Sequence, residues 1–477
     1  MLLRCAAVFL SLGSGGVAAI QSDWSRFRGP NGTGVADVDG LPVELDRDEN
    51  LAWRTALPPG HSSPVLSDTL VFLTAFEGDE LLTFAIERES GAVAWKRALP
   101  RVFDCRIDQR NNRASPTPAV DGDLVVVFFQ DFGLAAYDHE GGERWRHALG
   151  PFDNVYGMGA SPILVGGAVV LACDQNVDSF LLALSKKDGS LLWRKARPWA
   201  KSGHCTPVLH EDGERPQLIL PGSFYLDGYD LETGERTWWV KGLSFEMKSV
   251  PVLHEGVVYI NGYGSPLNDP GQQVVMPDFA DVIGERDADD DGRVSKDEMP
   301  PGKAAAWFEF VDLDRSGALD SGEWTYLQDA LASHNGMLAI RAGGAGDRTK
   351  EGLVWSYHRS VPQLPSPLIY DGVLYMLGDQ GGLVTTFRPA SGEVLARGRV
   401  KGAEDAFYAA PVAGDGKVYL VGESGRLAVL PAGGSLEPLA VSELGERCYA
   451  TPALAEGCLY QRTEAALYCF VGDGGRK

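Results

Sequence analysis

Short apolar runs separated by glycine turns recur along most of the chain. In the stretch 114–145, apolar residues lead to a turn at Asp121-Gly122, a run from Leu124 to Phe129, a second run from Leu134 to Tyr137, and a further strand that begins at Trp145 after another glycine turn. β-Branched and aromatic residues favour strands, and Asp-Gly or Gly-Gly pairs supply the positive φ of tight hairpins. The pattern therefore predicts four short antiparallel strands, a sheet that cannot bury both of its faces alone.

A small residue followed by proline opens each copy of this unit. Eight such steps occur: Ser63-Pro64, Ser115-Pro116, Ser161-Pro162, Thr206-Pro207, Val250-Pro251, Ser366-Pro367, Ala410-Pro411 and Thr451-Pro452. Successive steps lie 41 to 52 residues apart, except for one gap of 116 residues after Pro251. Four-stranded units with that period are typical of propeller blades. The sequence thus predicts an all-β, eight-bladed propeller with an insertion of about 70 residues in blade five.

The two ends of the chain complement each other. The eighth copy stops after its third strand, near Val471, whereas the run Leu51 to Leu57 has no partner strands before it and nearly repeats the run Val93 to Leu99. We expect this N-terminal strand to become the fourth strand of the last blade and to close the ring, because closure removes an exposed sheet edge. An open β-solenoid is the alternative, and it leaves the orphan strand unexplained.

Fourth strands supply a second marker of the repeat. They carry Trp95, Trp145, Trp193, Trp238 and Trp355, while those of blades six and seven are expected to begin near Val394 and Leu436. The predicted propeller spans 50–267 and 335–477, after an ordered lead-in at 20–49.

Residues 1–19 have the charged, apolar and small-residue regions of a secretory signal. A buried first strand is the alternative interpretation. No later stretch reaches the roughly 20 apolar residues of a membrane-spanning helix, so we expect a periplasmic or secreted protein. A net charge of −22 argues against nucleic acid and anionic membranes as partners.

Residues 268–334 replace the β pattern with two acidic loops of twelve residues, 287–298 and 312–323. In each loop, oxygen-bearing side chains stand at positions 1, 3, 5 and 12, glycine at position 6, and a backbone carbonyl is offered at position 7, as in an EF-hand calcium loop. The predicted ligands of two Ca²⁺ ions are Asp287, Asp289, Asp291, Arg293 and Glu298, then Asp312, Asp314, Ser316, Ala318 and Glu323. Arg293 and Ala318 contribute their carbonyls.

Apolar residues before, between and after the loops predict helices around them, and Val294 and Leu319 are placed to pair the loops. The insertion holds 16 acidic and 5 basic residues, so half of the net charge of the chain lies there. Pro300-Pro301 shortens the helix after the first loop, which favours a structural calcium module over a calcium-driven switch. A disordered acidic insertion is the alternative.

Three short motifs resemble the pyrroloquinoline-quinone-like (PQQ-like) propeller repeat over about residues 50–471: Ser63-Pro64-Val65, Leu182-Ala183-Leu184, and Thr233-Gly234-Glu235 before Trp238. The resemblance implies either of two functions, that of a quinone-dependent alcohol or glucose dehydrogenase or that of an outer-membrane assembly scaffold. PQQ is the cofactor implied by the first. The dehydrogenases usually carry an adjacent cysteine pair over the quinone, and this chain has neither a Cys-Cys pair nor a c-type haem motif.

In a propeller, the residue three before each opening proline is expected at the channel mouth. These residues are His61, Arg113, Gly159, His204, Lys248, Leu364, Tyr408 and Tyr449. His61, Arg113, His204, Lys248 and Tyr449 favour a small anionic or planar ligand, or a protein partner, on this face. A solvated polar rim without a ligand is the alternative. The eight positions hold no carboxylate, so a catalytic base would have to be a neighbour such as Asp153 or Glu246.

Two functional hypotheses follow. The first is a calcium-binding propeller, secreted or periplasmic, that acts as a binding or scaffold protein. The second is a PQQ-dependent oxidoreductase of alcohols or sugars.

Cys458 and Cys469 flank a hairpin whose turn is expected at Thr463-Glu464. A two-residue turn would place the two cysteines directly opposite each other, where a disulfide or two free thiols are both compatible with the sequence.

Overall fold

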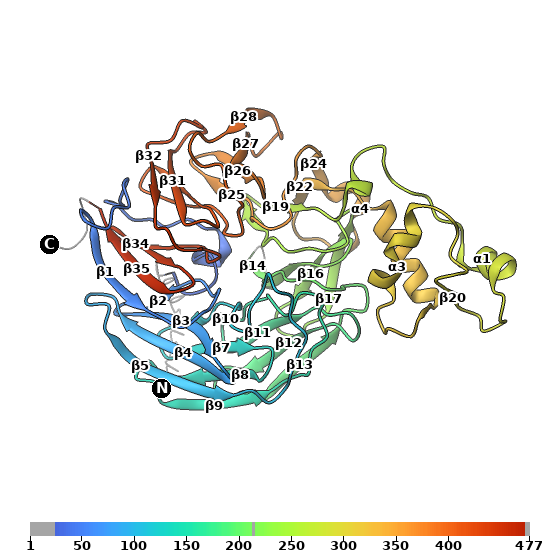
Figure 1. Cartoon of the computed structure of the whole chain (residues 1–477), viewed down its shortest axis with the longest axis horizontal. Helices are drawn as coiled ribbons and strands as arrows, with labels where there is room; N and C mark the ends of the chain where they lie inside the picture. Colours follow the sequence, from blue (N-terminus) through green and yellow to red (C-terminus); the bar gives the residue numbers. More distant parts are fainter. Residues whose placement is uncertain (1–23, 212–214, 473–477) are drawn as a thin grey trace, which may run out of the picture.

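Eight β-sheets stand as blades around a central channel in the computed structural model, which describes residues 24–211 and 215–472 (Figure 1). The predicted signal peptide at 1–19 lies outside the described residues. The prediction of an eight-bladed propeller is confirmed. Within each blade the strands are antiparallel and run in sequence order from the channel outward, except in blade eight, where the outermost strand comes from the N-terminal part of the chain.

The first four blades contain the following strands: β2 (Val65–Leu66), β3 (Leu70–Glu77), β4 (Glu80–Glu87) and β5 (Val93–Pro100); β6 (Ala119–Val120), β7 (Val125–Phe129), β8 (Gly133–Tyr137) and β9 (Glu143–Ala148); β10 (Ile163–Val165), β11 (Ala168–Cys173), β12 (Phe180–Ser185) and β13 (Leu191–Ala196); β14 (Val208–His210), β15 (Gln217–Pro221), β16 (Tyr225–Asp230) and β17 (Arg236–Lys241).

The last four blades contain β18 (Val252–His254), β19 (Val257–Gly262), β22 (Gly336–Arg341) and β24 (Leu353–Tyr357); β25 (Leu368–Tyr370), β26 (Val373–Leu377), β27 (Leu383–Phe387) and β28 (Val394–Arg399); β29 (Val412–Gly414), β30 (Lys417–Val421), β31 (Arg426–Pro431) and β32 (Ala440–Glu443); β33 (Ala453–Ala455), β34 (Cys458–Arg462), β35 (Ala466–Val471) and β1 (Leu51–Ala56). β1 pairs antiparallel with β35, so the predicted closure of the ring by the N-terminal strand is also confirmed.

Tryptophans on five of the eight outermost strands join a blade to the next. The indole nitrogen of Trp95 donates to the carbonyl of His139 at 2.7 Å, and a Cβ built on Gly141 would lie 2.8 Å from the Trp95 ring. Only glycine fits there, where φ is +83°. Four further pairs repeat the contact: Trp53 with Gly91, Trp145 with Gly189, Trp193 with Gly234, and Trp355 with Gly392.

Trp238 departs from this arrangement. It lies against Gly228 of its own blade and donates to Gln217 at 2.8 Å. A short strand from blade five, β23 (Gly346–Asp347), pairs in parallel with β17 beside it, and the helix α4 (Thr349–Gly352) follows. An additional strand therefore covers the outer edge of blade four.

Residues 24–36 of the lead-in segment plug the channel. They include the short 3-10 helix η1 (Pro30–Gly32) and bond to the inner strands of several blades through their backbone and side chains (Figure 1). The Arg26 and Arg28 guanidinium groups are buried and donate to the carbonyls of Pro207 and Pro367, in blades four and six. Burial lowers the pKa of each arginine to about 9. The segment thus ties together inner strands that lie far apart in the sequence.

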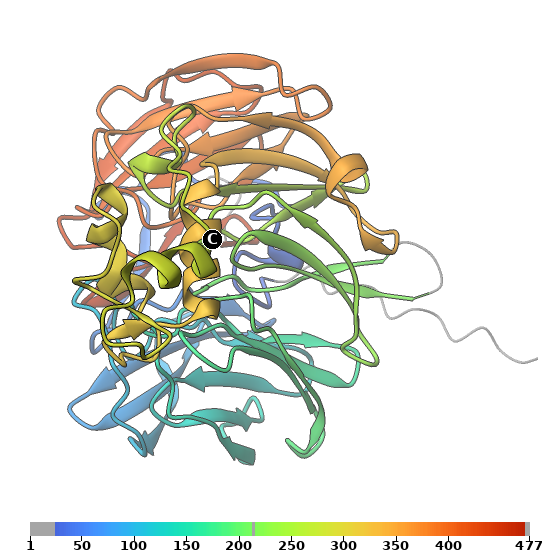
Figure 2. The ribbon, with the colours of Figure 1, turned by 90° about the vertical axis from the view of Figure 1, so that its right-hand side faces the viewer.

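The insertion joins β19 to β22 and stands against one side of the ring (Figure 2). It contains, in order, η2 (Pro266–Asn268), α1 (Phe279–Arg286), β20 (Val294–Ser295), η3 (Lys303–Trp307), α2 (Phe308–Val311), β21 (Ala318–Leu319) and α3 (Ser321–Ala332). Val294 pairs with Leu319, as the sequence predicts. No helix follows the first acidic loop until η3, consistent with the effect of Pro300-Pro301.

Two local predictions are wrong. β32 begins at Ala440 rather than near Leu436, because Pro438 intervenes and lacks the amide hydrogen needed for strand pairing. The two-residue turn of the hairpin before β35 lies one residue later than expected, at Glu464-Ala465, since the Thr463 amide donates to the carbonyl of Ala466 at 2.8 Å.

The displaced turn shifts the cysteine register. Cys458 therefore faces Val471, and Cys469 faces Tyr460. The two cysteines are diagonal neighbours rather than direct partners, and both are buried and not joined in a disulfide.

Among the described residues, no helix is long and apolar enough to cross a membrane.

Candidate functional site

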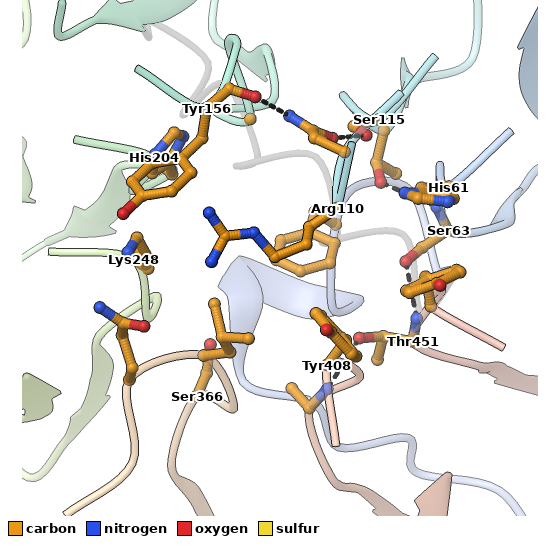
Figure 3. A pocket seen from close by; sticks show the side chains of 18 of the residues that line it. His61, Ser63, Arg110, Ser115, Tyr156, His204, Lys248, Ser366, Tyr408 and Thr451 are labelled. Atoms are coloured by element: carbon orange, nitrogen blue, oxygen red, sulfur yellow. Dashed lines mark hydrogen bonds between the residues drawn. The ribbon is translucent and has the colours of Figure 1, made fainter. Parts of the chain in front are cut away.

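A cavity of about 410 Å³ opens at one end of the channel (Figure 3). Its lining comes mainly from the loops that lead into the first strands of the blades, with Phe27 of the lead-in segment also contributing. His61, His204, Lys248 and Tyr449 all line it, as do Gly159, Leu364 and Tyr408. The blade period thus brings together seven of the eight positions selected from the sequence.

Arg113 is the exception, because blade two opens two residues later than the sequence pattern predicts. A chain of hydrogen bonds between neighbouring blades identifies the equivalent positions: the Ser63 amide donates to Thr117 Oγ1 at 3.0 Å, and the Thr117 amide donates to Ser161 Oγ at 2.9 Å. Thr117-Pro118, and not Ser115-Pro116, is therefore the opening step of blade two. Ser115 is the equivalent residue at the mouth, and it does line the cavity.

Arg113 is held by other groups. Its guanidinium pairs with the buried carboxylate of Asp131 and, at 3.4 Å, with Asp104. It does not line the cavity.

One side of the cavity is aromatic. The ring of His61 stacks on Tyr449 with centroids 4.0 Å apart, and Tyr408 meets Tyr449 edge-on at 5.0 Å. The Tyr449 hydroxyl donates to Glu423 at 3.0 Å, which fixes the ring. Burial, helped by the positive charges of Arg462 and Arg447, lowers the pKa of His61 to about 3. His61 is therefore neutral at physiological pH and serves as a flat, polar surface.

The opposite side gathers two cations around Tyr156. The Lys248 ammonium lies 4.4 Å from the centroid of the Tyr156 ring, and the Arg110 guanidinium lies 5.1 Å from it. Figure 3 shows Arg110 reaching across the cavity toward Tyr156, His204 and Lys248. Such contacts with an aromatic face stabilise each cation by about 0.5–1 kcal/mol at exposed sites.

Each of these cations already has a carboxylate partner. Lys248 pairs with the buried Glu246 at 3.0 Å, and Arg110 pairs with Asp108 at 2.7 Å. The hydrogen bond from Arg110 lowers the pKa of Asp108 to about 2. An anionic ligand would therefore compete with Asp108 for the exposed Arg110 more readily than with the buried Glu246 for Lys248.

His204 adds an unused polar atom to this side. Burial, assisted by the nearby Lys248, lowers its pKa to about 3, so the imidazole is neutral. Its Nε2 is buried and has no hydrogen-bond partner in the described part of the chain. A neutral imidazole can donate or accept one hydrogen bond at this atom, according to its tautomer.

Asp379 is the only carboxylate of the described residues that lines the cavity. Burial raises its pKa, while the amides of Gln363 and Leu364 oppose that shift by donating to its two oxygens at 2.7 and 2.9 Å. Both oxygens thus hold a loop in place. Asp153 and Glu246, the two neighbouring carboxylates suggested by the sequence, are absent from the lining.

Arg110, Tyr156 and Asp379 were missed by the sequence reasoning. They lie in loops of unequal length, between β5 and β6, between β9 and β10, and between β26 and β27. The repeat period predicts where the first strands lie. It does not predict how far loops of unequal length fold back over the channel.

The two acidic loops gather oxygen atoms outside the cavity. Carboxylate oxygens of Asp287, Asp289 and Asp291 lie within 4.8 Å of one another in the first loop, as do those of Asp312, Asp314 and Glu323 in the second. The turns are closed by glycine amides: Gly292 donates to Asp287 at 3.0 Å and Gly317 donates to Asp312 at 2.9 Å. Both glycines have positive φ, +73° and +87°.

The two loops differ at position 12. Both glutamates accept hydrogen bonds from the amides at positions 2 and 9 of their loops, but only Glu323 brings an oxygen into the compact cluster of its loop. At position 5 of the second loop, the Ser316 hydroxyl donates to the carbonyl of Ala318 at 2.8 Å. Donor sets made only of oxygen suit hard cations such as Ca²⁺.

The repeated four-stranded blades and the tryptophan contacts between them define a PQQ-like β-propeller. The family model for the outer membrane protein assembly factor BamB matches residues 34–176 and 225–476, which is most of the chain. The chain therefore belongs to this family.

Individual relatives are distant. The outer membrane protein assembly factor BamB of Francisella salina is 23% identical over 154 residues, a match covering 31% of this chain and 28% of that relative. The crystal structure of BamB from Moraxella catarrhalis has a TM-score of 0.52 and 12% identity, covering 89% of this chain and all of that one. A europium-containing methanol dehydrogenase has a TM-score of 0.58 and 9% identity, covering 94% and 98%. At these identities the structural matches show the fold alone.

Proposed function

We propose that this chain is a calcium-binding propeller that acts as a binding or scaffold protein, with its ligand site in the cavity at the channel mouth. The residues that line the cavity support this function most directly. Two neutral imidazoles, three tyrosines and two cations converge there from separate blades, while the one carboxylate that lines it among the described residues accepts hydrogen bonds from backbone amides. Such a surface can recognise a planar or anionic group and offers no free carboxylate for proton abstraction.

The occupant is either a small planar anion or an exposed segment of a protein. His204 Nε2 and Arg110 are the groups most available to it, because the first has no hydrogen-bond partner among the residues that the structure describes and the second is exposed. The BamB family membership favours the protein segment, since the family is described as an outer membrane protein assembly factor. A location in the periplasm or outside the cell agrees with that description and with the signal pattern of residues 1–19.

The two acidic loops are proposed as EF-hand sites for two Ca²⁺ ions. Asp287, Asp289, Asp291, Glu298 and the Arg293 carbonyl would hold one ion, and Asp312, Asp314, Ser316, Glu323 and the Ala318 carbonyl the other. The oxygen clusters, the positive-φ glycines and the pairing of β20 with β21 support this assignment. For a protein outside the cytoplasm, dissociation constants on the order of 10⁻⁴ to 10⁻³ M suffice.

A PQQ-dependent oxidoreductase is the rival function. The stacked His61 and Tyr449 rings give the cavity a flat wall that suits a planar cofactor. A quinone polarised by a metal also needs carboxylate ligands beside it. Asp379 is the only lining carboxylate among the described residues, and the clusters suited to a metal lie in the insertion. The residues that line the cavity therefore do not fit a metal-bound quinone.

The proposal is tested by placing a photo-crosslinking amino acid at Tyr408, within the cavity lining, and at Lys187, in a groove between blades two and three. Crosslinking in cells should give a discrete adduct from position 408 that is lost when Arg110→Ala and His204→Ala are added, and none from position 187. Equal adducts from both positions, or an adduct that survives the two substitutions, would contradict a specific site in the cavity.

A further inference from the structure

The insertion does not stand free of the propeller but contacts the two loops that form the cationic side of the cavity. One is the loop 149–162, which carries Tyr156, and the other is the loop 242–251, which carries Lys248. The two loops belong to blades three and five, with blade four between them. They meet at the contact between Lys248 and Tyr156, 4.4 Å from ammonium to ring centroid.

The contact with the Tyr156 loop comes from the second acidic loop. Arg315, at position 4 of that loop, donates to Asp153 at 2.7 Å. Asp153 is held from its own side as well, since its amide donates to Gln175 at 3.0 Å. The neighbouring Asn154 accepts a hydrogen bond from the Tyr156 amide at 3.0 Å. The Arg315 guanidinium thus binds a residue only three positions before Tyr156, whose ring lines the cavity.

The contact with the Lys248 loop is apolar. Phe245 is buried and packs edge-on against Trp307 at 5.0 Å and Phe310 at 5.4 Å, both in the insertion. Glu246, the next residue, is the buried partner of Lys248. Anchoring Phe245 therefore also limits where the Lys248 ammonium can lie.

We propose that the insertion is a clamp on the cavity, and that a cation in the second acidic loop regulates ligand binding by fixing the clamp. Arg315 projects from the turn between the ligand positions Asp314 and Ser316, so an ion that orders this turn also orders the guanidinium. Trp307 and Phe310 lie just before the same loop and respond with it. Arg315 and Trp307 are positioning residues, since neither lines the cavity. Regulation by a cation rests on the proposed calcium sites, whereas the clamp formed by Arg315 and Trp307 does not depend on them.

Hydrogen exchange read by mass spectrometry tests the clamp in the full chain without calcium. Arg315→Ala should raise the exchange rate within 152–159, and Trp307→Ala within 242–249, by about two- to five-fold, the range expected from one exposed ion pair or aromatic pair. Acetylation of Lys248 by succinimidyl acetate should accelerate in Trp307→Ala. Two matched controls should change neither segment: Lys296→Ala, which removes an exposed ion pair inside the insertion, and Phe279→Ala, whose ring packs on Trp324.

Exchange within α3 shows whether the insertion stays folded in each variant. The clamp is refuted if the insertion stays folded and the exchange rates of Arg315→Ala and Trp307→Ala within 152–159 and 242–249 equal those of the two controls.

Calcium provides the second arm. Millimolar Ca²⁺ should slow exchange in 152–159 and 242–249 of the unmodified protein, and Arg315→Ala should abolish the effect in 152–159 while still taking up calcium in calorimetry. Calcium uptake without slowing in either segment would refute the regulation. Absence of uptake by the unmodified protein would refute the proposed ion sites alone, and the clamp would then be judged from the calcium-free variants.

Discussion

The two cavity histidines make the stability of the propeller depend on pH in a predictable direction. Burial lowers the pKa of His204 from 6.5 to about 3. In the unfolded chain, His204 binds a proton as the pH falls below 6.5. In the folded chain, His204 stays neutral until the pH nears 3. The stabilising effect of the neutral ring is therefore present above pH 6.5 and is lost progressively as the pH falls toward 3.

The size of the effect follows from the shift. Each unit of pH below 6.5 costs up to about 1.4 kcal/mol of unfolding free energy per histidine, so pH 5 costs up to roughly 2 kcal/mol. His204 keeps one side toward the solvent-accessible cavity, and screening by water reduces this figure to about 1 kcal/mol. His204→Gln keeps a polar side chain but cannot titrate, so it should remove this part of the acid sensitivity.

Urea unfolding at pH 7 and pH 5 measures the difference. We expect the unfolding free energy of the unmodified protein to fall by about 1 kcal/mol more than that of His204→Gln between the two pH values. His61→Gln should behave alike, because burial lowers the pKa of His61 to about 3 as well. Parallel loss of stability in the unmodified protein and both variants would refute the assignment of buried neutral imidazoles.

Two further predictions concern the insertion and the blade contacts. Glu323→Gln should remove one of two calcium equivalents in calorimetry and leave the urea midpoint of the propeller unchanged; retention of both equivalents would contradict the second site. Gly141→Ala should cost about 2 kcal/mol or more of unfolding free energy, because φ is +83° and the new Cβ would meet Trp95 at 2.8 Å, whereas Gly122→Ala, with open space around it, should cost almost nothing. Equal urea midpoints for the two alanine variants would exclude the packing role of Gly141.

The fold could be predicted because each blade repeats the same short sequence pattern. Glycine turns, apolar runs and an opening proline recur with a period set by four strands, and the orphan strand at Leu51 has one vacant edge to fill. The two acidic loops are equally local, since all of their ligand positions lie within twelve residues. Local signals of this kind survive in a single sequence.

What could not be predicted depends on choices between near-equal local alternatives or on long-range packing. Ser115-Pro116-Thr117-Pro118 offers two openings, and only the hydrogen bonds between blades select Thr117. The last hairpin turns at Glu464-Ala465, one residue later than expected, because the Thr463 hydroxyl accepts hydrogen bonds from the amides of Ala465 and Ala466. The plug formed by the lead-in, and the reach of Arg110 over the cavity, follow from contacts between segments far apart in the chain.

Dye-linked oxidation of alcohols and sugars, after addition of PQQ and calcium, distinguishes the binding function from the oxidoreductase function. We expect no turnover above that of the denatured protein, because Asp379, the one lining carboxylate in the described part of the chain, is held by the amides of Gln363 and Leu364. Turnover that Asp379→Asn abolishes, while Glu423→Gln at the cavity edge leaves it intact, would contradict the binding function and establish the oxidoreductase.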